Sequence, residues 1–156
     1  MNHRGEAMTD AGDLEIFADE LFTVAHCPSC AVPGYVIARL LDGSTSLAEL
    51  PAGTAQALGA LLSKTVRAIE TTVGAERVYC LSFAELDRRL HFHLFPRTAW
   101  LLEEYWRATG SREEAVNGPV LFEWARTSLA PGVGLPAGAG SVADACTALR
   151  AQLRDA

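Results

Sequence analysis

Two histidines lie two residues apart in the segment 90–97, and imidazole rings suit catalysis near neutral pH. An apolar residue follows each histidine, which is typical of an alternating β-strand. Side chains alternate in direction along a strand, so His91 and His93 should share one face with Arg89. Such imidazoles suit attack on phosphorus, proton transfer or metal binding, and a neighbouring guanidinium suits phosphate. The spacing alone is equally consistent with two histidines that are only structural residues of a sheet.

The surrounding segments predict the elements that must position these residues. The best helix covers 54–73, where apolar residues recur every three or four positions and Gly74 stands where a C-terminal cap would. Three further helices are expected over 99–109, 119–129 and 142–153. A tight turn at 18–20 joins the first two of five expected strands into a hairpin. The expected strands cover 14–18, 21–26, 35–41, 77–83 and 90–95.

The order of these elements is strands, helix, strands and then helices. The strict alternation of a parallel α/β fold is missing, so we expect an α+β fold with an antiparallel sheet. A chain of 156 residues has the size of one domain. We expect a flexible N-terminal tail over 1–13 and a single domain over 14–156. Its core should cover about 14–98, with a C-terminal helical extension over 99–156.

Composition and charge exclude several classes of protein. The net charge of −6 argues against a broad nucleic-acid surface. No apolar stretch approaches the roughly 18 residues of a membrane span. Residues 1–13 are polar and carry no hydrophobic secretory segment, so we expect a cytoplasmic protein.

The order of several motifs resembles that of the histidine-triad (HIT-like) superfamily. A Pro-Gly-Tyr strand start at 33–35, a Leu-x-x-Leu turn at 47–50 and a long helix precede the histidine strand. The family pattern has three histidines alternating with apolar residues, often followed by Pro-Arg. Aligned on the Pro-Arg pair at 96–97, this chain has His91 at the middle position, His93 at the third and Arg89 at the first. The resemblance covers about residues 14–98.

The resemblance implies both a fold and an activity. The fold would be a five-stranded antiparallel sheet with the long helix on one face, often in a homodimer that joins two sheets. The activity would be hydrolysis or nucleotidyl transfer at the α-phosphate of a nucleotide conjugate, for example a dinucleoside polyphosphate. In the family the middle histidine is the nucleophile and the third contacts the phosphate or the leaving group. These roles would fall to His91 and His93.

The arginine at the first triad position leaves other functions open. Arg89 would neutralise phosphate, but it cannot relay a proton because a guanidinium stays protonated. A non-catalytic nucleotide-binding protein of the same fold is therefore the main alternative to an enzyme. An interaction module with incidental histidines is a third. The intact pair of His91 and His93 favours the enzyme.

Two further residues are candidates for binding the substrate. Arg97 lies at the exit of the histidine strand, where it would either bind phosphate or pair with Glu103 or Glu104. By resemblance, the loop after His26 borders the ribose and base of the nucleotide. His26 would then line the pocket, although a plain surface histidine is the favoured interpretation.

Cys27 and Cys30 have the Cys-x-x-Cys spacing of metal and redox sites. Tetrahedral zinc needs four ligands, and His26 is the single obvious third ligand nearby. A thioredoxin-like site is excluded because no helix is expected to begin at the motif. We therefore expect a loop with reduced thiols, without a metal and without any cofactor.

Overall fold

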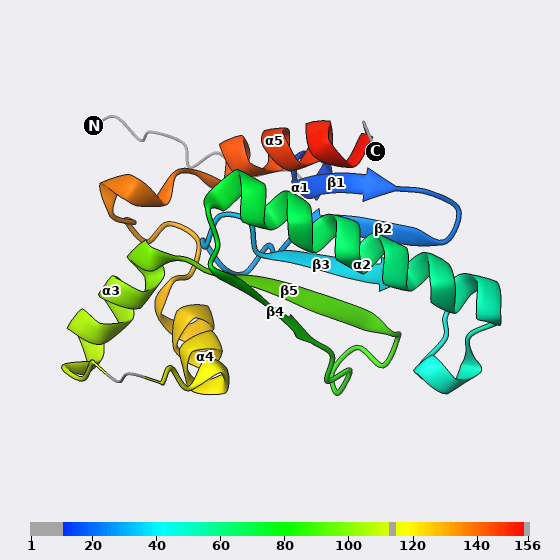
Figure 1. Ribbon diagram of the computed structural model, residues 1–156, viewed down its shortest axis with the longest axis horizontal. Helices are drawn as coiled ribbons and strands as arrows, with labels where there is room; N and C mark the ends of the chain where they lie inside the picture. Colours follow the sequence, from blue (N-terminus) through cyan, green and yellow to red (C-terminus); the bar gives the residue numbers. More distant parts are fainter. Residues whose placement is uncertain (1–10, 113–114, 155–156) are drawn as a thin grey trace, which may run out of the picture.

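The computed structural model describes residues 11–112 and 115–154, and its centre is one five-stranded sheet. The strand order is β1-β2-β3-β5-β4 and all neighbours are antiparallel (Figure 1). The α+β class and the five strands are thus confirmed, with ends shifted by one or two residues. The strands are β1 (Glu15–Ala18), β2 (Phe22–His26), β3 (Val36–Leu40), β4 (Arg77–Leu81) and β5 (His91–Arg97).

Residues 11–13, expected within the flexible tail, form a short helix α1 (Ala11–Leu14) together with Leu14. Arg150 on helix α5 (Val142–Arg154) explains the difference. Its guanidinium donates hydrogen bonds to the backbone carbonyls of Asp13 and of Glu15, the latter at 2.7 Å. These partners lie more than 130 positions apart, so no local sequence signal indicates the contact. Residues 1–10 lie outside the described part of the chain.

The expected hairpin between β1 and β2 is confirmed. Asp19 closes its turn, because its Oδ1 accepts hydrogen bonds from the backbone N–H groups of Leu21 and Phe22 at 2.8 and 2.7 Å. An aspartate that caps its own turn in this way is a common local solution. β2 then continues antiparallel to β3 without a break in register.

The long helix α2 (Ala52–Val73) begins two residues before the predicted start and ends where predicted. Gly74 follows with the left-handed φ of +65° that favours glycine, and its N–H donates to the carbonyl of Glu70. The expected apolar stripe is buried, with Leu58, Leu61 and Ile69 among its members. No helix in the described ranges is long and apolar enough to cross a membrane.

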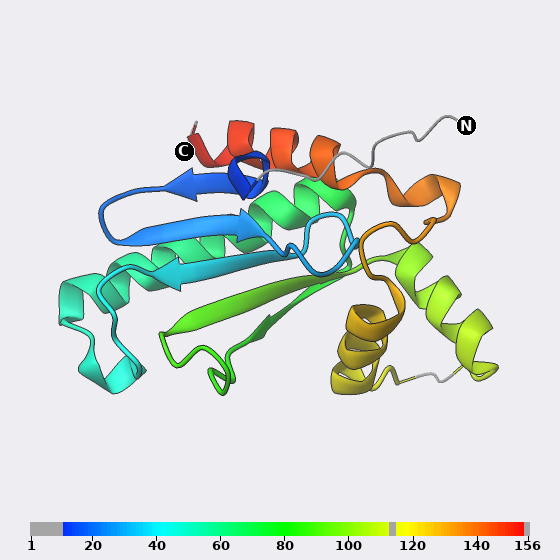
Figure 2. The same cartoon turned by 180° about the vertical axis from the view of Figure 1, so that it is seen from behind.

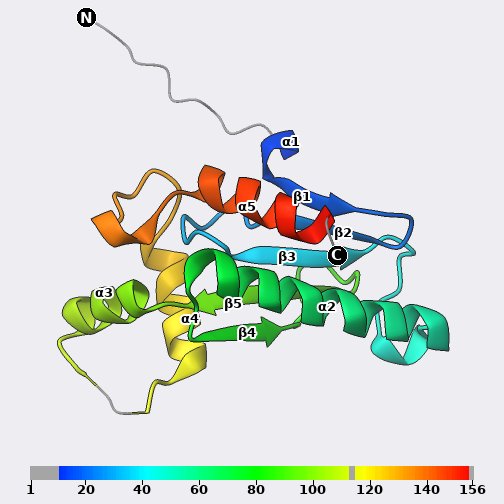
Figure 3. The same ribbon diagram turned by 45° about the horizontal axis from the view of Figure 1, so that its top comes forward.

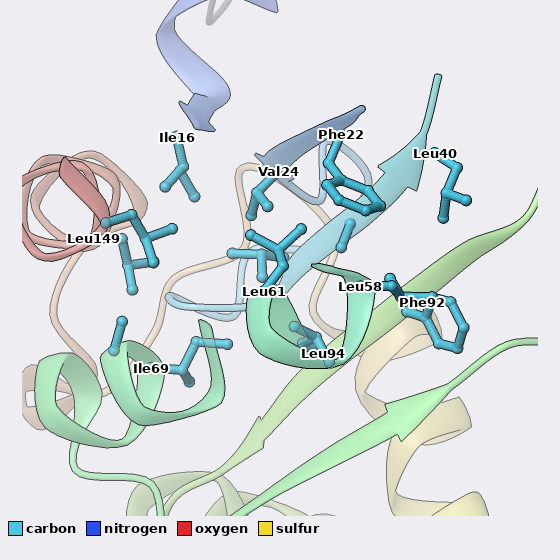
Figure 4. Close-up of a cluster of buried hydrophobic side chains, with 14 of the residues drawn as sticks. Ile16, Phe22, Val24, Leu40, Leu58, Leu61, Ile69, Phe92, Leu94 and Leu149 are labelled. Carbon is cyan, nitrogen blue, oxygen red and sulfur yellow. The ribbon is translucent and has the colours of Figure 1, made fainter. Parts of the chain in front are cut away.

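α2 and α5 lie side by side on the same face of the sheet (Figures 1 and 3). The main hydrophobic core fills the space between these helices and the strands. Figure 4 shows Leu61 of α2, Leu149 of α5, Val24 of β2 and Leu94 of β5 pointing into this space. The alternation of the strands therefore leaves their other side chains on the opposite face.

That opposite face, called the open face below, is seen in Figure 2 with no helix lying across β2, β3 and β5. Helices α3 (Ala99–Thr109) and α4 (Gly118–Ser128) lie at one end of it. A second hydrophobic cluster joins them to the sheet through side chains that include Tyr35, Phe95 and Phe122. The C-terminal helices thus wall off one end of the open face.

The docking of α5 can be tested by truncating Leu149, which is fully buried in the main core. Leu149→Ala should lower the free energy of unfolding by about 2–5 kcal/mol, because it leaves a cavity between α5 and the sheet. Leu86 is fully exposed, so Leu86→Ala should change the free energy of unfolding by less than about 0.5 kcal/mol. Urea denaturation gives both values. Equal values for the two variants would show that α5 is not part of the core.

Candidate active site on the open face

The register of β5 places the two histidines on the open face. His91 lies opposite Arg39 of β3, and His93 lies between Ile37 of β3 and Leu81 of β4. The ring centroids of the histidines are 5.2 Å apart. One small molecule can therefore contact both rings.

His91 is held by a hydrogen bond to its own segment. Its Nδ1 lies 2.7 Å from the backbone carbonyl oxygen of Arg89. A carbonyl can only accept, so Nδ1 carries the proton and Nε2 of the neutral ring keeps its lone pair. The hydroxyl of Ser82 donates to the carbonyl of His91 at 2.7 Å, which fixes the start of β5 against the segment after β4. The ring is thus oriented by its Nδ1, and His91 is 7% exposed, so that Nε2 is the nitrogen left for chemistry.

His93 is half-buried, and its Nδ1 shares a hydrogen bond of 2.7 Å with the hydroxyl of Tyr35. Burial and, to a smaller extent, the neighbouring His91, Arg126 and Arg39 together lower the pKa of His93 to about 4. The His93 ring is therefore neutral at neutral pH. Burial also raises the pKa of the Tyr35 phenol, so its hydroxyl keeps its proton.

Tyr35 and Phe122 complete the surroundings of His93. Gly34 positions Tyr35, because its φ of +87° turns the chain into β3 and a Cβ there would lie 3.0 Å from a methyl of Val73. Phe122 of α4 meets the ring of His93 edge-on, with centroids 6.2 Å apart. Tyr35 enters the sequence motifs only as part of the Pro-Gly-Tyr strand start. Strand alternation carries a usable signal for Tyr35, because it places residues 35, 37 and 39 on one face.

Arg89 lies outside the histidine strand, so strand alternation does not set the direction of its side chain. β5 begins at His91, and the side chain of Arg89 is 66% exposed. Asp87 holds this side chain instead: its two carboxylate oxygens accept from Nε and Nη2 of Arg89 at 2.9 and 2.8 Å, and one also accepts from the backbone N–H. The Arg89 hydrogen bonds hold the pKa of Asp87 well below its usual range.

Arg97 also has a different partner from the one expected. Its Nη2 lies 3.5 Å from Oε2 of Glu76, whereas Glu103 and Glu104 bind other arginines. The expected pairing of Arg97 with either glutamate is therefore wrong. Arg97 lies four residues beyond His93, about 13 Å along the strand, at the opposite end of β5 from His91.

His26 is not a surface residue, which corrects the favoured interpretation. It is 2% exposed, and the loop that follows β2 covers it. Its Nδ1 lies 3.0 Å from the carbonyl oxygen of Cys27, and its Nε2 lies 3.1 Å from that of Val32 and 3.2 Å from the amide nitrogen of Gly34. Burial lowers the pKa of His26 and keeps it neutral. Its ring nitrogens are thus engaged in holding the loop.

Two cavities of the described structure flank the histidine strand. A cavity of about 300 Å³ lies over β2 and β3, and its lining includes His26, Thr23, Ala25, Ile37 and Arg39. A second of about 540 Å³ lies between β4 and α4, lined among others by Tyr79, Leu81, Phe83, Phe122 and Arg126. Both sizes suit small-molecule sites. A two-part substrate could extend to either side of the histidines.

Cys27 and Cys30 are buried in the loop after β2. The Sγ of Cys27 lies 3.4 Å from the Ser29 hydroxyl, and the Sγ of Cys30 lies 3.8 Å from the carbonyl oxygen of Ala125. Within 11–112 and 115–154, no three histidine, cysteine or acidic side chains lie close enough together to hold a metal ion.

Comparison with known proteins identifies the fold. No model of a known protein family matches the sequence, and no curated protein matches it. Solved structures do match over most of the chain. A hypothetical histidine triad nucleotide-binding protein from Sulfolobus tokodaii has 12% identity and a TM-score of 0.58, covering 91% of this chain and 84% of that one. A histidine triad protein from Bradyrhizobium japonicum has 17% identity and a TM-score of 0.56, covering 88% of each chain.

A zinc-bound histidine triad family protein from Mycobacterium smegmatis is a further match. It has 16% identity and a TM-score of 0.55, covering 91% of this chain and 84% of that one. At such identities the likeness concerns the fold. The chain has the HIT-like fold that the sequence motifs indicate.

The neutrality of His93 can be tested by titration. Its ring signal in NMR should titrate with a midpoint of about 4, whereas an ordinary histidine titrates near 6.5. Between these values the unfolded chain binds more protons than the folded one, so His93 lowers the free energy of unfolding as pH falls from about 7 to 4. His93→Gln should remove this part of the acid sensitivity in urea denaturation. A midpoint near 6.5 would contradict the buried environment of the ring.

Proposed function

We propose that the protein is a hydrolase or nucleotidyl transferase that acts on nucleotide conjugates, with His91 as its nucleophile. The observation that carries the proposal is the hydrogen bond from His91 Nδ1 to the carbonyl of Arg89, which leaves Nε2 with a free lone pair on the open face. The Sulfolobus tokodaii neighbour is described as a hypothetical nucleotide-binding protein, which supports the substrate class by analogy of fold.

The reaction has two steps. Nε2 of His91 attacks the α-phosphorus, the bond from phosphorus to the leaving oxygen breaks, and its electron pair departs with the leaving group. Water then attacks the α-phosphorus of the nucleotidyl–histidine, a new P–O bond forms, and the P–N bond breaks with its electron pair returning to Nε2. The mononucleotide is released, with one proton of the water passing to solvent.

His93 suits binding of the phosphate better than protonation of the leaving group. Its pKa of about 4 makes it a neutral ring. If the protonated hydroxyl of Tyr35 donates to Nδ1, then Nε2 of His93 carries a hydrogen that a phosphate oxygen can accept. Leaving groups that depart as phosphate anions need no proton. Dinucleoside polyphosphates are therefore favoured over conjugates that release an amine.

A non-catalytic nucleotide-binding protein is the second candidate function. One observation favours it: the first triad position is occupied by Arg89, whose side chain is exposed and paired with Asp87. No proton relay can run through that position. Turnover with intact His91 is what separates the two candidates.

Turnover is tested with a panel of adenosine and guanosine polyphosphate conjugates followed by mass spectrometry. The wild type should release a mononucleotide and carry a transient nucleotidyl adduct. His91→Ala should lose both, with a rate loss of several powers of ten, because it removes the proposed nucleophile. His93→Ala should lower the rate of turnover by about 10²–10³-fold, as expected for the loss of one hydrogen-bond donor to the transition state.

Arg89→His is the control for the first triad position, since it restores the family pattern without touching the other two histidines. An increase in rate would show that the arginine impairs turnover. Binding of a conjugate without turnover in the wild type would support the second candidate. Wild-type turnover in His91→Ala would contradict the mechanism.

We also propose a homodimer joined along β4. β4 is the last strand of the sheet, so its outer edge has unpaired backbone groups. The apolar cavity of about 540 Å³ follows this edge, and Phe83 beside it is 68% exposed. Pairing of two such edges would satisfy the backbone and cover the cavity.

The dimer is tested by light scattering at increasing concentration. Phe83→Asp should shift the protein towards the monomer, because it places a charge in the apolar contact. Leu86→Asp is the matched control, since Leu86 is fully exposed and does not line the cavity. A wild type that stays monomeric at high concentration would contradict the proposal.

A further inference from the structure

Arg39 is the cation that the sheet places directly beside the histidines. It lies on β3 opposite His91, and Cβ atoms of such pairs are about 5 Å apart. On its other side, Arg39 lies opposite Thr23 of β2, which is uncharged.

The guanidinium of Arg39 lacks a partner for one of its nitrogens. Nη1 is buried and makes no hydrogen bond, and no described carboxylate lies within ion-pair distance of this side chain. Asp87 is close enough to feel the charge of Arg39, but its carboxylate is held by Arg89. The two arginines therefore differ: the exposed one is paired and the half-buried one is not.

An unpartnered guanidinium in this position favours binding of an anion. Burial of a charge without a partner is unfavourable, and arginine cannot relieve it by losing its proton. The planar fork of N–H donors matches two oxygens of a phosphate group. An anion that contacts Arg39 would thus satisfy the nitrogen that the protein leaves unbound.

The surroundings fit a phosphate that also reaches the histidines. Arg39 lines the cavity of about 300 Å³ over β2 and β3, which adjoins the His91 side of the face. Arg126 lies beyond His93, its guanidinium carbon 5.4 Å from the centroid of the Phe122 ring. Both arginines are close enough to influence the ionisation of His93. The histidines are therefore flanked by positive charge on two sides.

We infer that Arg39, rather than Arg89, binds the phosphate group of the substrate and holds it against His91. The ligand class is a phosphate ester or anhydride with its negative charge on the group that reacts. The inference deepens the proposed function and rests on it for the identity of the reacting phosphate. Anion binding by Arg39 stands independently of turnover.

The test uses inorganic pyrophosphate as the probe, measured by calorimetry on the full chain at two salt concentrations. Arg39→Gln should weaken binding by about 10- to 100-fold, the loss expected for a hydrogen-bonded charge, and should reduce the salt dependence. Arg89→Gln is the matched control, since it removes the same charge two residues from His91, and should weaken binding less than about twofold. Arg39→Lys keeps the charge without the fork and should bind with intermediate affinity.

Two outcomes would overturn the inference: equal affinity of Arg39→Gln and wild type, or a larger loss in Arg89→Gln. Failure of the wild type to bind pyrophosphate would overturn it as well. If Arg39→Gln does not fold, Arg39→Lys decides, because wild-type affinity there would remove any role for the fork. The proposed function fails separately. If pyrophosphate binding depends on Arg39 but no conjugate is turned over, the proposed enzymatic function is wrong and the anion site remains. If Arg39→Gln turns over conjugates at the wild-type rate, the enzymatic function remains and the role of Arg39 is wrong.

Discussion

The antiparallel pairing of β3 with β5 is the interaction on which the rest of the structure depends. It sets Leu94 beside Val36 on the face covered by α2, and His93 beside Ile37 on the open face. A shift of one residue would exchange the two sets, burying the histidines under α2 and exposing the leucine. The apolar core therefore selects the register, and the register selects which side chains can react. Stability and chemistry are fixed by the same hydrogen bonds.

Arginine supplies lasting positive charge on the open face. Burial keeps His93 and His26 neutral, so neither supplies a cation at neutral pH. Arg39 and Arg126 carry the positive charge next to the histidines. This division lets the imidazoles keep lone pairs and N–H groups for bond making while the arginines attract the anion. A protonated His91 could not attack phosphorus at all.

The sequence predicted the features that depend on periodicity. The strands, the α2 stripe with its Gly74 cap and the shared face of His91 and His93 follow from local alternation and apolar spacing. The partners of the arginines were harder to predict, because a long side chain can turn to any carboxylate within reach. Arg89 turned to Asp87 two residues away, and Arg97 to Glu76 across the end of the sheet. The burial of His26 depends on a loop path, which spacing does not specify. The roles of His91 and His93 stay predictions.

The contact between Phe122 and His93 makes the burial of this histidine depend on the position of α4. Phe122 belongs to a helix that follows the sheet in sequence and covers one end of the open face. If α4 swings away, the ring of His93 gains water and its affinity for a proton rises towards that of a free imidazole. By linkage, acid must then favour the opened form over the closed one.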